Sequence, residues 1–159
     1  MSWKVRRRCE ARLRGLQLPA DAMSMPDVVA HLERARGRQI ELRPFHMPDG
    51  GPSGVWLPSS QADYVFYEAA TSARHQAQII GHELGHMAAG HTPAVHQALG
   101  RLPSLFLAGG AADLMLLRDE YESAEEDEAE TMADALLARI ERAAAVAGDD
   151  AFLGALRRS

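Results

Sequence analysis

Hydrophobic residues recur at a helical spacing in the first quarter of the chain. One loose stripe falls within residues 2–16, and a clearer one follows Ser24, a favourable N-cap residue. Pro26 suits the first turn of that second helix, and Gly37 is placed to end it. The second stripe consists of Val28, Val29, Leu32 and Ala35. The pattern predicts two helices within residues 2–37.

The hydrophobic period changes over residues 38–68. Three short runs there alternate or are rich in β-branched and aromatic residues, and Pro- and Gly-rich stretches separate the first two. The runs are 40–43, 55–57 and 64–67. We expect three short strands that form an antiparallel sheet.

The rest of the chain returns to a helical pattern. We expect a helix over residues 72–90 and a last long helix over residues 119–147. The apolar segment 92–118 between them is interpreted as an insertion or lid. No internal repeat or linker suggests a second domain. The pattern therefore predicts one mainly helical α+β domain, with a small three-stranded antiparallel sheet packed on the helix 72–90.

Composition agrees with one folded domain. The chain has 159 residues, of which 47% are hydrophobic and 25% charged, and a domain of this size does not need disulfides to stay folded. Its single cysteine, Cys9, suits a reducing compartment. No apolar run follows the basic N-terminus as it would in a signal peptide. The longest apolar stretch, 105–117, contains Asp113 and is shorter than the ~20 residues that span a bilayer. We expect a cytoplasmic protein without a membrane partner.

The net charge of -5 hides an asymmetry along the chain. Six Lys or Arg residues lie within the first 14 positions, and eight acidic residues lie within 119–130. The basic segment is interpreted as the solvated face of a short helix, with a docking patch for a partner or nucleic acid as the alternative. Since no aromatic residue is interleaved among its cations, we expect no direct nucleic-acid binding.

One short motif carries metal chemistry. Residues 82–86 read His-Glu-Leu-Gly-His, which is the H-E-x-x-H pattern of zinc peptidases. With about 100° of rotation per residue, His82 and His86 lie only about 40° apart around a helix and one turn apart along it. Both imidazoles can therefore reach one Zn²⁺ ion, which accepts nitrogen donors at about 2.0–2.1 Å. The motif predicts a zinc site with these two histidines as ligands.

Glu83 and the remainder of that helix fit the same site. Glu83 lies about 100° around from His82, beside the metal position, where its carboxylate can act as general base and then as general acid. Gly85 removes a side chain close to the histidine face, where a neighbouring backbone can approach. The opposite face is apolar and consists of Ala77, Ile80, Leu84, Met87 and Ala88. We expect Glu83 to be the catalytic carboxylate.

A catalytic zinc requires a third protein ligand and an open position. The extended metzincin pattern fails here, because the position of its third histidine is Thr92 and that of its glycine is Ala89. His91 would point about 180° away from His82 if the helix continued. It can therefore serve as a ligand only if the helix breaks at Gly90.

The acidic segment offers carboxylates instead. The last helix has an apolar stripe at Ala129, Ala133, Leu136, Leu137 and Ile140. Projected backwards, the stripe places Glu126 near its centre, and binding a cation would offset the cost of burying that carboxylate. Asp127 and Glu128 project away and are expected to be solvated. Glu126 is the leading third ligand, Glu122 and His91 are alternatives, and a solvated acidic first turn is the interpretation without a metal.

Two stretches together resemble the ImmA/IrrE family of zinc metallopeptidases, which combine H-E-x-x-H with a distal glutamate as gluzincins do. The first is Ile79-Ile80-Gly81-His82-Glu83-Leu84-Gly85-His86. The second, residues 126–137, resembles the family's E-x-E-A-(N/D)-x-F-A-x-x-L-L segment. The order of elements also agrees, so the resemblance covers about residues 24–140. Glu130 and Met132 depart from the family pattern, and the long interval between the two stretches implies an insertion.

The resemblance implies zinc held by His82, His86 and Glu126, with Glu83 as the catalytic carboxylate. It also implies a zinc-dependent endopeptidase that cleaves a regulatory protein, such as a helix-turn-helix repressor or antitoxin encoded nearby. The alternative function is a metal-containing toxin or interaction module that binds its partner and cleaves nothing.

Overall fold

The computed structural model describes residues 3–18, 24–47, 49–91 and 123–147. The helices are α1 (Trp3–Gly15), α2 (Met25–Arg36), α3 (Ala73–Ala89) and α5 (Ser123–Ala147), and the strands are β1 (Gln39–Phe45), β2 (Gly54–Pro58) and β3 (Ala62–Glu68). The predicted mainly helical α+β fold with three short strands is confirmed. The expected insertion at 92–118 and the start of the last predicted helix lie outside the described residues.

Local sequence signals explain where α2 and α3 begin and end. The Ser24 side chain accepts a hydrogen bond from the Asp27 amide, and the Asp27 carboxylate accepts one from the Ser24 amide, so the two residues form a capping box. The Ser72 side chain caps α3 by accepting a hydrogen bond from the His75 amide. Gly37 and Gly90, with φ of 64° and 75°, end the two helices in the left-handed conformation that glycine adopts without strain.

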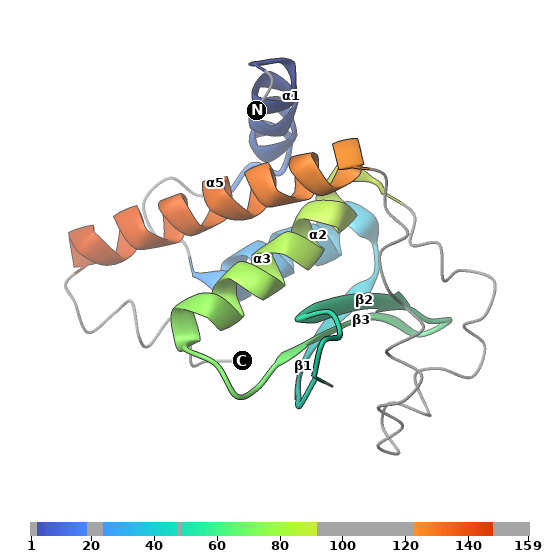
Figure 1. The fold of residues 1–159 in the computed structure, drawn as a ribbon. Helices are drawn as coiled ribbons and strands as arrows, with labels where there is room; N and C mark the ends of the chain where they lie inside the picture. The colour runs from blue at the N-terminus through green and yellow to red at the C-terminus, as the bar shows by residue number, and fades with distance from the viewer. Residues whose placement is uncertain (1–2, 19–23, 48, 92–122, 148–159) are drawn as a thin grey trace.

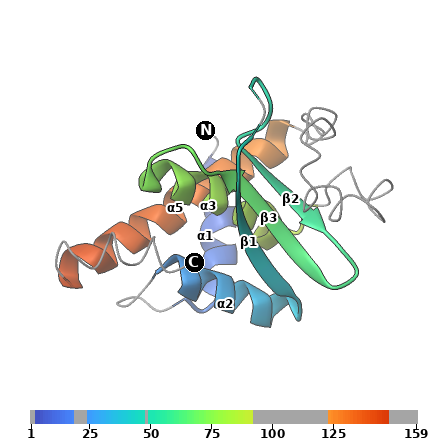
Figure 2. The ribbon, with the colours of Figure 1, turned by 90° about the horizontal axis from the view of Figure 1, so that it is seen from below.

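The sheet differs from the prediction in its strand pairing. Its order is β1-β3-β2, with β1 parallel to β3 and β2 antiparallel to β3 (Figure 2). The expected fully antiparallel sheet is therefore wrong. The three-residue connection 59–61 makes β2 and β3 a hairpin, whereas the connection 46–53 is long enough for β2 to skip one strand position. Hydrophobic alternation marks each strand but does not specify its neighbour.

Helix α3 lies at the centre of the fold, with α5 along one side and the sheet on another (Figure 1). One hydrophobic cluster joins α1, α2, α3, α5 and the inner face of the sheet, and includes Leu13, Leu32, Val65, Leu84 and Leu136. Such burial of apolar surface stabilises a domain by about 25 cal/mol for each Å² removed from water. A second buried cluster lies on the other face of the sheet and consists of Val55, Leu57 and Phe66. No helix in the described part of the chain combines the length and hydrophobicity needed to cross a membrane.

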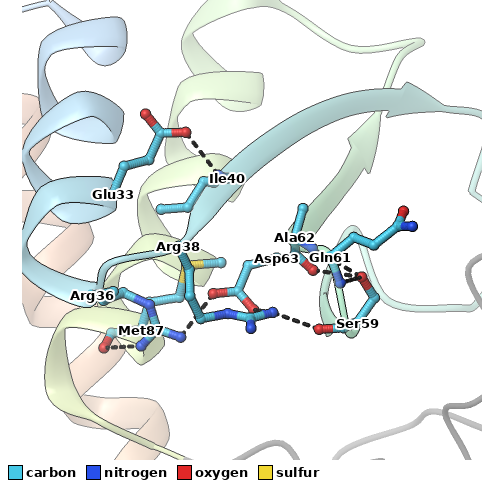
Figure 3. Close-up of polar contacts among 9 residues, drawn as sticks. All are labelled: Glu33, Arg36, Arg38, Ile40, Ser59, Gln61, Ala62, Asp63 and Met87. Atoms are coloured by element: carbon cyan, nitrogen blue, oxygen red, sulfur yellow. Dashed lines mark hydrogen bonds and ion pairs between the residues drawn. The ribbon is translucent and has the colours of Figure 1, made fainter.

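A buried ion cluster fastens the sheet to the end of α3 (Figure 3). The Asp63 carboxylate on β3 is fully buried and lies 2.8 Å from an Arg36 nitrogen and 3.4 Å from an Arg38 nitrogen. Arg36 also donates to the Met87 carbonyl at 3.2 Å. The last carbonyls of a helix have no partner within the helix, and a cation there also complements the helix dipole. The cluster therefore sets where α3 ends relative to β3.

Candidate metal centre

The structure brings His82, His86 and Glu126 together between α3 and α5. The two histidines lie one turn apart on α3, and Glu126 lies in the first turn of α5. The Nε2 atoms of His82 and His86 are 3.0 Å apart. Glu126 Oε2 is 3.3 Å from His82 Nε2, and Glu126 Oε1 is 3.5 Å from His86 Nε2. Two imidazoles and one carboxylate thus face a common point.

These spacings fit a metal ion. With ligand bonds of about 2.0–2.2 Å, tetrahedral angles place neighbouring ligand atoms about 3.3 Å apart. The three groups each offer one ligand atom, and all three atoms lie within 4.8 Å of one another. His82, His86 and Glu126 can therefore hold a metal ion without rearrangement of the helices.

Gly85 explains how Glu126 comes so close to the histidines. A Cβ atom at Gly85 would lie 2.8 Å from the Ala129 carbonyl oxygen and 3.1 Å from Ala129 Cα. Any larger residue would therefore push α5 away from α3. The predicted close backbone approach at Gly85 is confirmed, and its partner is the α5 turn that follows Glu126.

Glu83 lies beside the three groups and is buried, with 6% of the residue exposed. Burial, and then the nearby charge of Glu126, raises its pKa to about 8, while a hydrogen bond from the Trp56 amide acts in the opposite direction. β2 can lie this close because residue 54 is glycine: a Cβ there would be 3.0 Å from Glu83 Oε1. The carboxylate is therefore enclosed by α3 and β2, with Glu126 nearby.

The two histidines differ in their surroundings. His86 is fully buried, whereas the His82 side chain is 24% exposed. Burial, followed by the neighbouring His82 and His91, lowers the pKa of His86 to about 3. A neutral imidazole keeps a lone pair on one ring nitrogen, which is the form that binds a metal.

Two sequence-based predictions about the acids need correction. Glu126 was expected in the middle of a buried stripe, but its side chain is 41% exposed and lies at the rim. Glu128 was expected in solvent, but it is buried, with 4% exposed. The reason is that α5 packs on α1 as well as on α3, so its buried face is wider than one stripe. Asp127 is exposed, as expected. Glu122 lies outside the described residues.

His91 is not in the group of three, although it touches one of its members. α3 ends at Ala89, and Gly90 turns the chain so that His91 folds back into the protein, with 9% exposed. Its Nδ1 atom lies 2.9 Å from His86 Nδ1, on the side of the ring away from Glu126, and its Nε2 lies 3.3 Å from Glu128 Oε2. His91 therefore contacts His86 through the ring nitrogen that does not face Glu126, and Glu128 contacts His91.

Sequence reasoning missed the contribution of α1. Arg12 lies 3.3 Å from Glu128 Oε1 and also donates to the Ala89 carbonyl, and Arg8 lies 3.6 Å from Glu128 Oε2. The signal in the sequence was the basic α1 facing an acidic α5, but charge patterns do not show which pairs meet. The predicted solvated basic face holds for Arg6 and Arg7, which are exposed.

The geometry of the site is the basis on which a function can be assigned. Comparisons of the chain with protein-family models, with curated proteins and with solved structures gave no match.

Proposed function

We propose that the chain is a zinc-dependent peptidase in which His82, His86 and Glu126 hold the metal and Glu83 transfers the proton. One observation carries the proposal: three potential ligand groups from two helices converge beside a fourth group, the buried carboxylate of Glu83. A structural histidine pair would not need a carboxylate from a second helix within 3.5 Å of both rings.

Zinc is the proposed metal because the donors include the two histidines of an H-E-x-x-H motif. Two imidazole nitrogens and one carboxylate oxygen are ligands of catalytic zinc sites, which keep a further position for solvent. Magnesium and calcium instead prefer oxygen ligands. When bound, zinc supplies a Lewis acid that polarises a peptide carbonyl and activates water.

Glu83 is the group of this chain that can move the proton. Peptide hydrolysis requires a base that takes a proton from the attacking water and an acid that returns one to the leaving amine. Glu83 follows His82 directly, so its carboxylate lies beside the ligand groups and not among them. The Trp56 amide and the close backbone at Gly54 hold that carboxylate in place.

The proposed substrate is a regulatory protein, namely a helix-turn-helix repressor or antitoxin encoded beside this chain. This part of the proposal comes from the resemblance of residues 79–86 and 126–137 to ImmA/IrrE peptidases. The metal site alone does not select a substrate, because the same chemistry occurs with many specificities.

The decisive test of the site compares Glu83→Gln with the protein carrying Glu83. The variant is expected to keep its fold and bind one zinc per chain, measured by circular dichroism and elemental analysis, and to lose at least about 100-fold in the rate of cleavage. Glu10→Gln makes the same chemical change at an exposed position of α1 and should cleave normally. Unimpaired cleavage by Glu83→Gln would rule out this site as the peptidase centre.

The substrate is tested separately, by incubating the zinc-loaded protein with the product of the neighbouring gene. Fragments identified by mass spectrometry, which disappear after zinc is removed by a chelator and return when zinc is added, would support regulatory proteolysis. Stoichiometric capture of the intact neighbour would instead favour the non-proteolytic interaction module. Digestion of unfolded casein without a preference for the neighbour would indicate a peptidase of broad range.

A further inference from the structure

A series of polar contacts runs from His86 to α1, beginning at the ring nitrogen of His86 that does not face His82 and Glu126. His86 Nδ1 lies 2.9 Å from His91 Nδ1, and His91 Nε2 lies 3.3 Å from Glu128 Oε2. Glu128 in turn lies 3.3 Å from Arg12 Nε. His86, His91 and Glu128 are all buried, with at most 9% exposed. The geometry points to His91 and Glu128 as positioning residues that hold His86 in its metal-binding tautomer and orientation.

The direction of each hydrogen bond follows from the metal site. His86 Nε2 faces His82 and Glu126, so this nitrogen must carry the lone pair for an ion. The proton of neutral His86 is then on Nδ1, which donates to His91 Nδ1. His91 must accept on Nδ1 and therefore carries its own proton on Nε2. That proton points to Glu128 Oε2, which is an acceptor. Both hydrogen bonds therefore have a consistent donor and acceptor.

The end of this series of contacts farthest from the metal site is stabilised by charge. Glu128 is buried, and an unpaired carboxylate there would be costly. Arg12 lies beside it and also donates to the carbonyls of Ala88 and Ala89 at the end of α3. α1 thereby fixes Glu128 relative to α3, which also carries His86. The inference therefore includes a role for α1 in metal binding, although α1 supplies none of the three ligand groups.

The other histidine provides an internal contrast. His82 Nδ1 lies 3.4 Å from Glu130 Oε2, but the Glu130 side chain is 59% exposed, whereas that of Glu128 is 5% exposed. An exposed contact competes with water and contributes little, while a buried one acts at a low dielectric. We therefore expect the orientation of His86 to depend strongly on its contact with His91. The orientation of His82 should depend far less on its contact with Glu130.

The inference rests on the proposed metal site. It is tested in the full chain by metal-binding measurements and by absorption spectroscopy. Zinc affinity is determined by competition with a chromogenic chelator, and the Co²⁺ derivative is examined for its visible absorption bands. His91→Ala and Glu128→Gln should each weaken zinc binding by about 10–100-fold, the usual effect of losing such an outer partner, and should alter the Co²⁺ spectrum. Glu130→Gln, the matched control, should do neither.

A second variant separates positioning from folding. His91→Gln keeps a side-chain oxygen that can accept from His86 Nδ1, so it should recover part of the affinity that His91→Ala loses. Unfolding of the metal-free proteins by urea shows whether a variant has simply lost its structure. Zinc affinity and Co²⁺ spectra unchanged in both His91→Ala and Glu128→Gln would overturn the inference. Failure of the unaltered protein to bind zinc would instead overturn the proposed function.

Discussion

The two flanks of α3 are built differently. Toward α5 the contact is backbone against backbone, because a Cβ at Gly85 would meet the carbonyl oxygen and Cα of Ala129. Toward β2 the contact is backbone against side chain, because a Cβ at Gly54 would overlap Ile79 Cγ2 and approach Glu83 Oε1. Each glycine permits a close approach. Only the neighbour of Gly85, however, is a backbone that cannot rotate away.

This difference separates two parts of the proposed chemistry. The α5 flank brings Glu126 to the histidines, whereas the β2 flank encloses Glu83. The polar contacts also differ. The ion pair between Arg74 and Glu141 on the α5 flank is largely exposed, whereas Asp63 on the sheet side is fully buried. Changes on the α5 flank should therefore weaken metal binding, and changes on the β2 flank should impair catalysis, while either kind of change can lower stability.

The largest loss of stability is expected for Asp63→Ala. This change leaves Arg36 and Arg38 without their buried partner, and breaking such a pair costs about 3–5 kcal/mol. We expect a value near 3 kcal/mol, because both arginines retain access to solvent. Urea unfolding measures the loss, with Asp49→Ala at an exposed position as control. A change below about 1 kcal/mol would show that the sheet is not fastened by this cluster.

Gly85→Ala tests the α5 flank. The added methyl group must push α5 away, so we expect about 1–3 kcal/mol of destabilisation. Displacement of Glu126 should weaken zinc binding in the same variant. Gly81→Ala is the matched control on the same helix, since its Cβ would lie 3.4 Å from Ala133 Cα, an ordinary contact. That variant should be neutral or more stable by up to about 1 kcal/mol. Equal behaviour of the two variants would contradict the proposed role of Gly85.

Gly54→Ala tests the β2 flank. Ile79 and Glu83 must shift to make room, which should cost about 1–2 kcal/mol of stability. The proposed peptidase activity should fall at least about tenfold because Glu83 is misplaced, while zinc stoichiometry stays at one per chain. Gly15→Ala, where a Cβ meets nothing within 4 Å, serves as control. Loss of bound zinc together with activity in Gly54→Ala would show that metal binding and catalysis do not depend on separate flanks of α3.

The smallest effect is expected for Arg74→Ala. The ion pair of Arg74 with Glu141 is exposed on both sides, and such pairs contribute little. We expect a change in the free energy of unfolding below about 0.5 kcal/mol, which should shrink further at high salt. A change above 1 kcal/mol would mean that polar contacts, and not only apolar packing, hold α5 against α3.

The sequence by itself determined the elements and part of the site. Ser24, Gly37 and Gly90 mark helix ends through local hydrogen bonding and backbone freedom, which do not depend on distant residues. The spacing of His82 and His86 places their imidazoles together on any α-helix. Glu126 could be selected as a candidate ligand from the periodicity of one helix, but the partial exposure of its side chain could not be predicted in that way.

Only the tertiary structure decided which elements are neighbours. The parallel pairing of β1 with β3 depends on the path of the 46–53 connection. The burial of Glu128 depends on α1 packing against α5, and the contact of His91 with His86 depends on the turn at Gly90. Periodicity describes one element at a time, whereas burial and pairing arise between elements far apart in the sequence. The candidate ligand residues could therefore be selected from local spacing, while the residues proposed to hold them in place could be identified only from the fold.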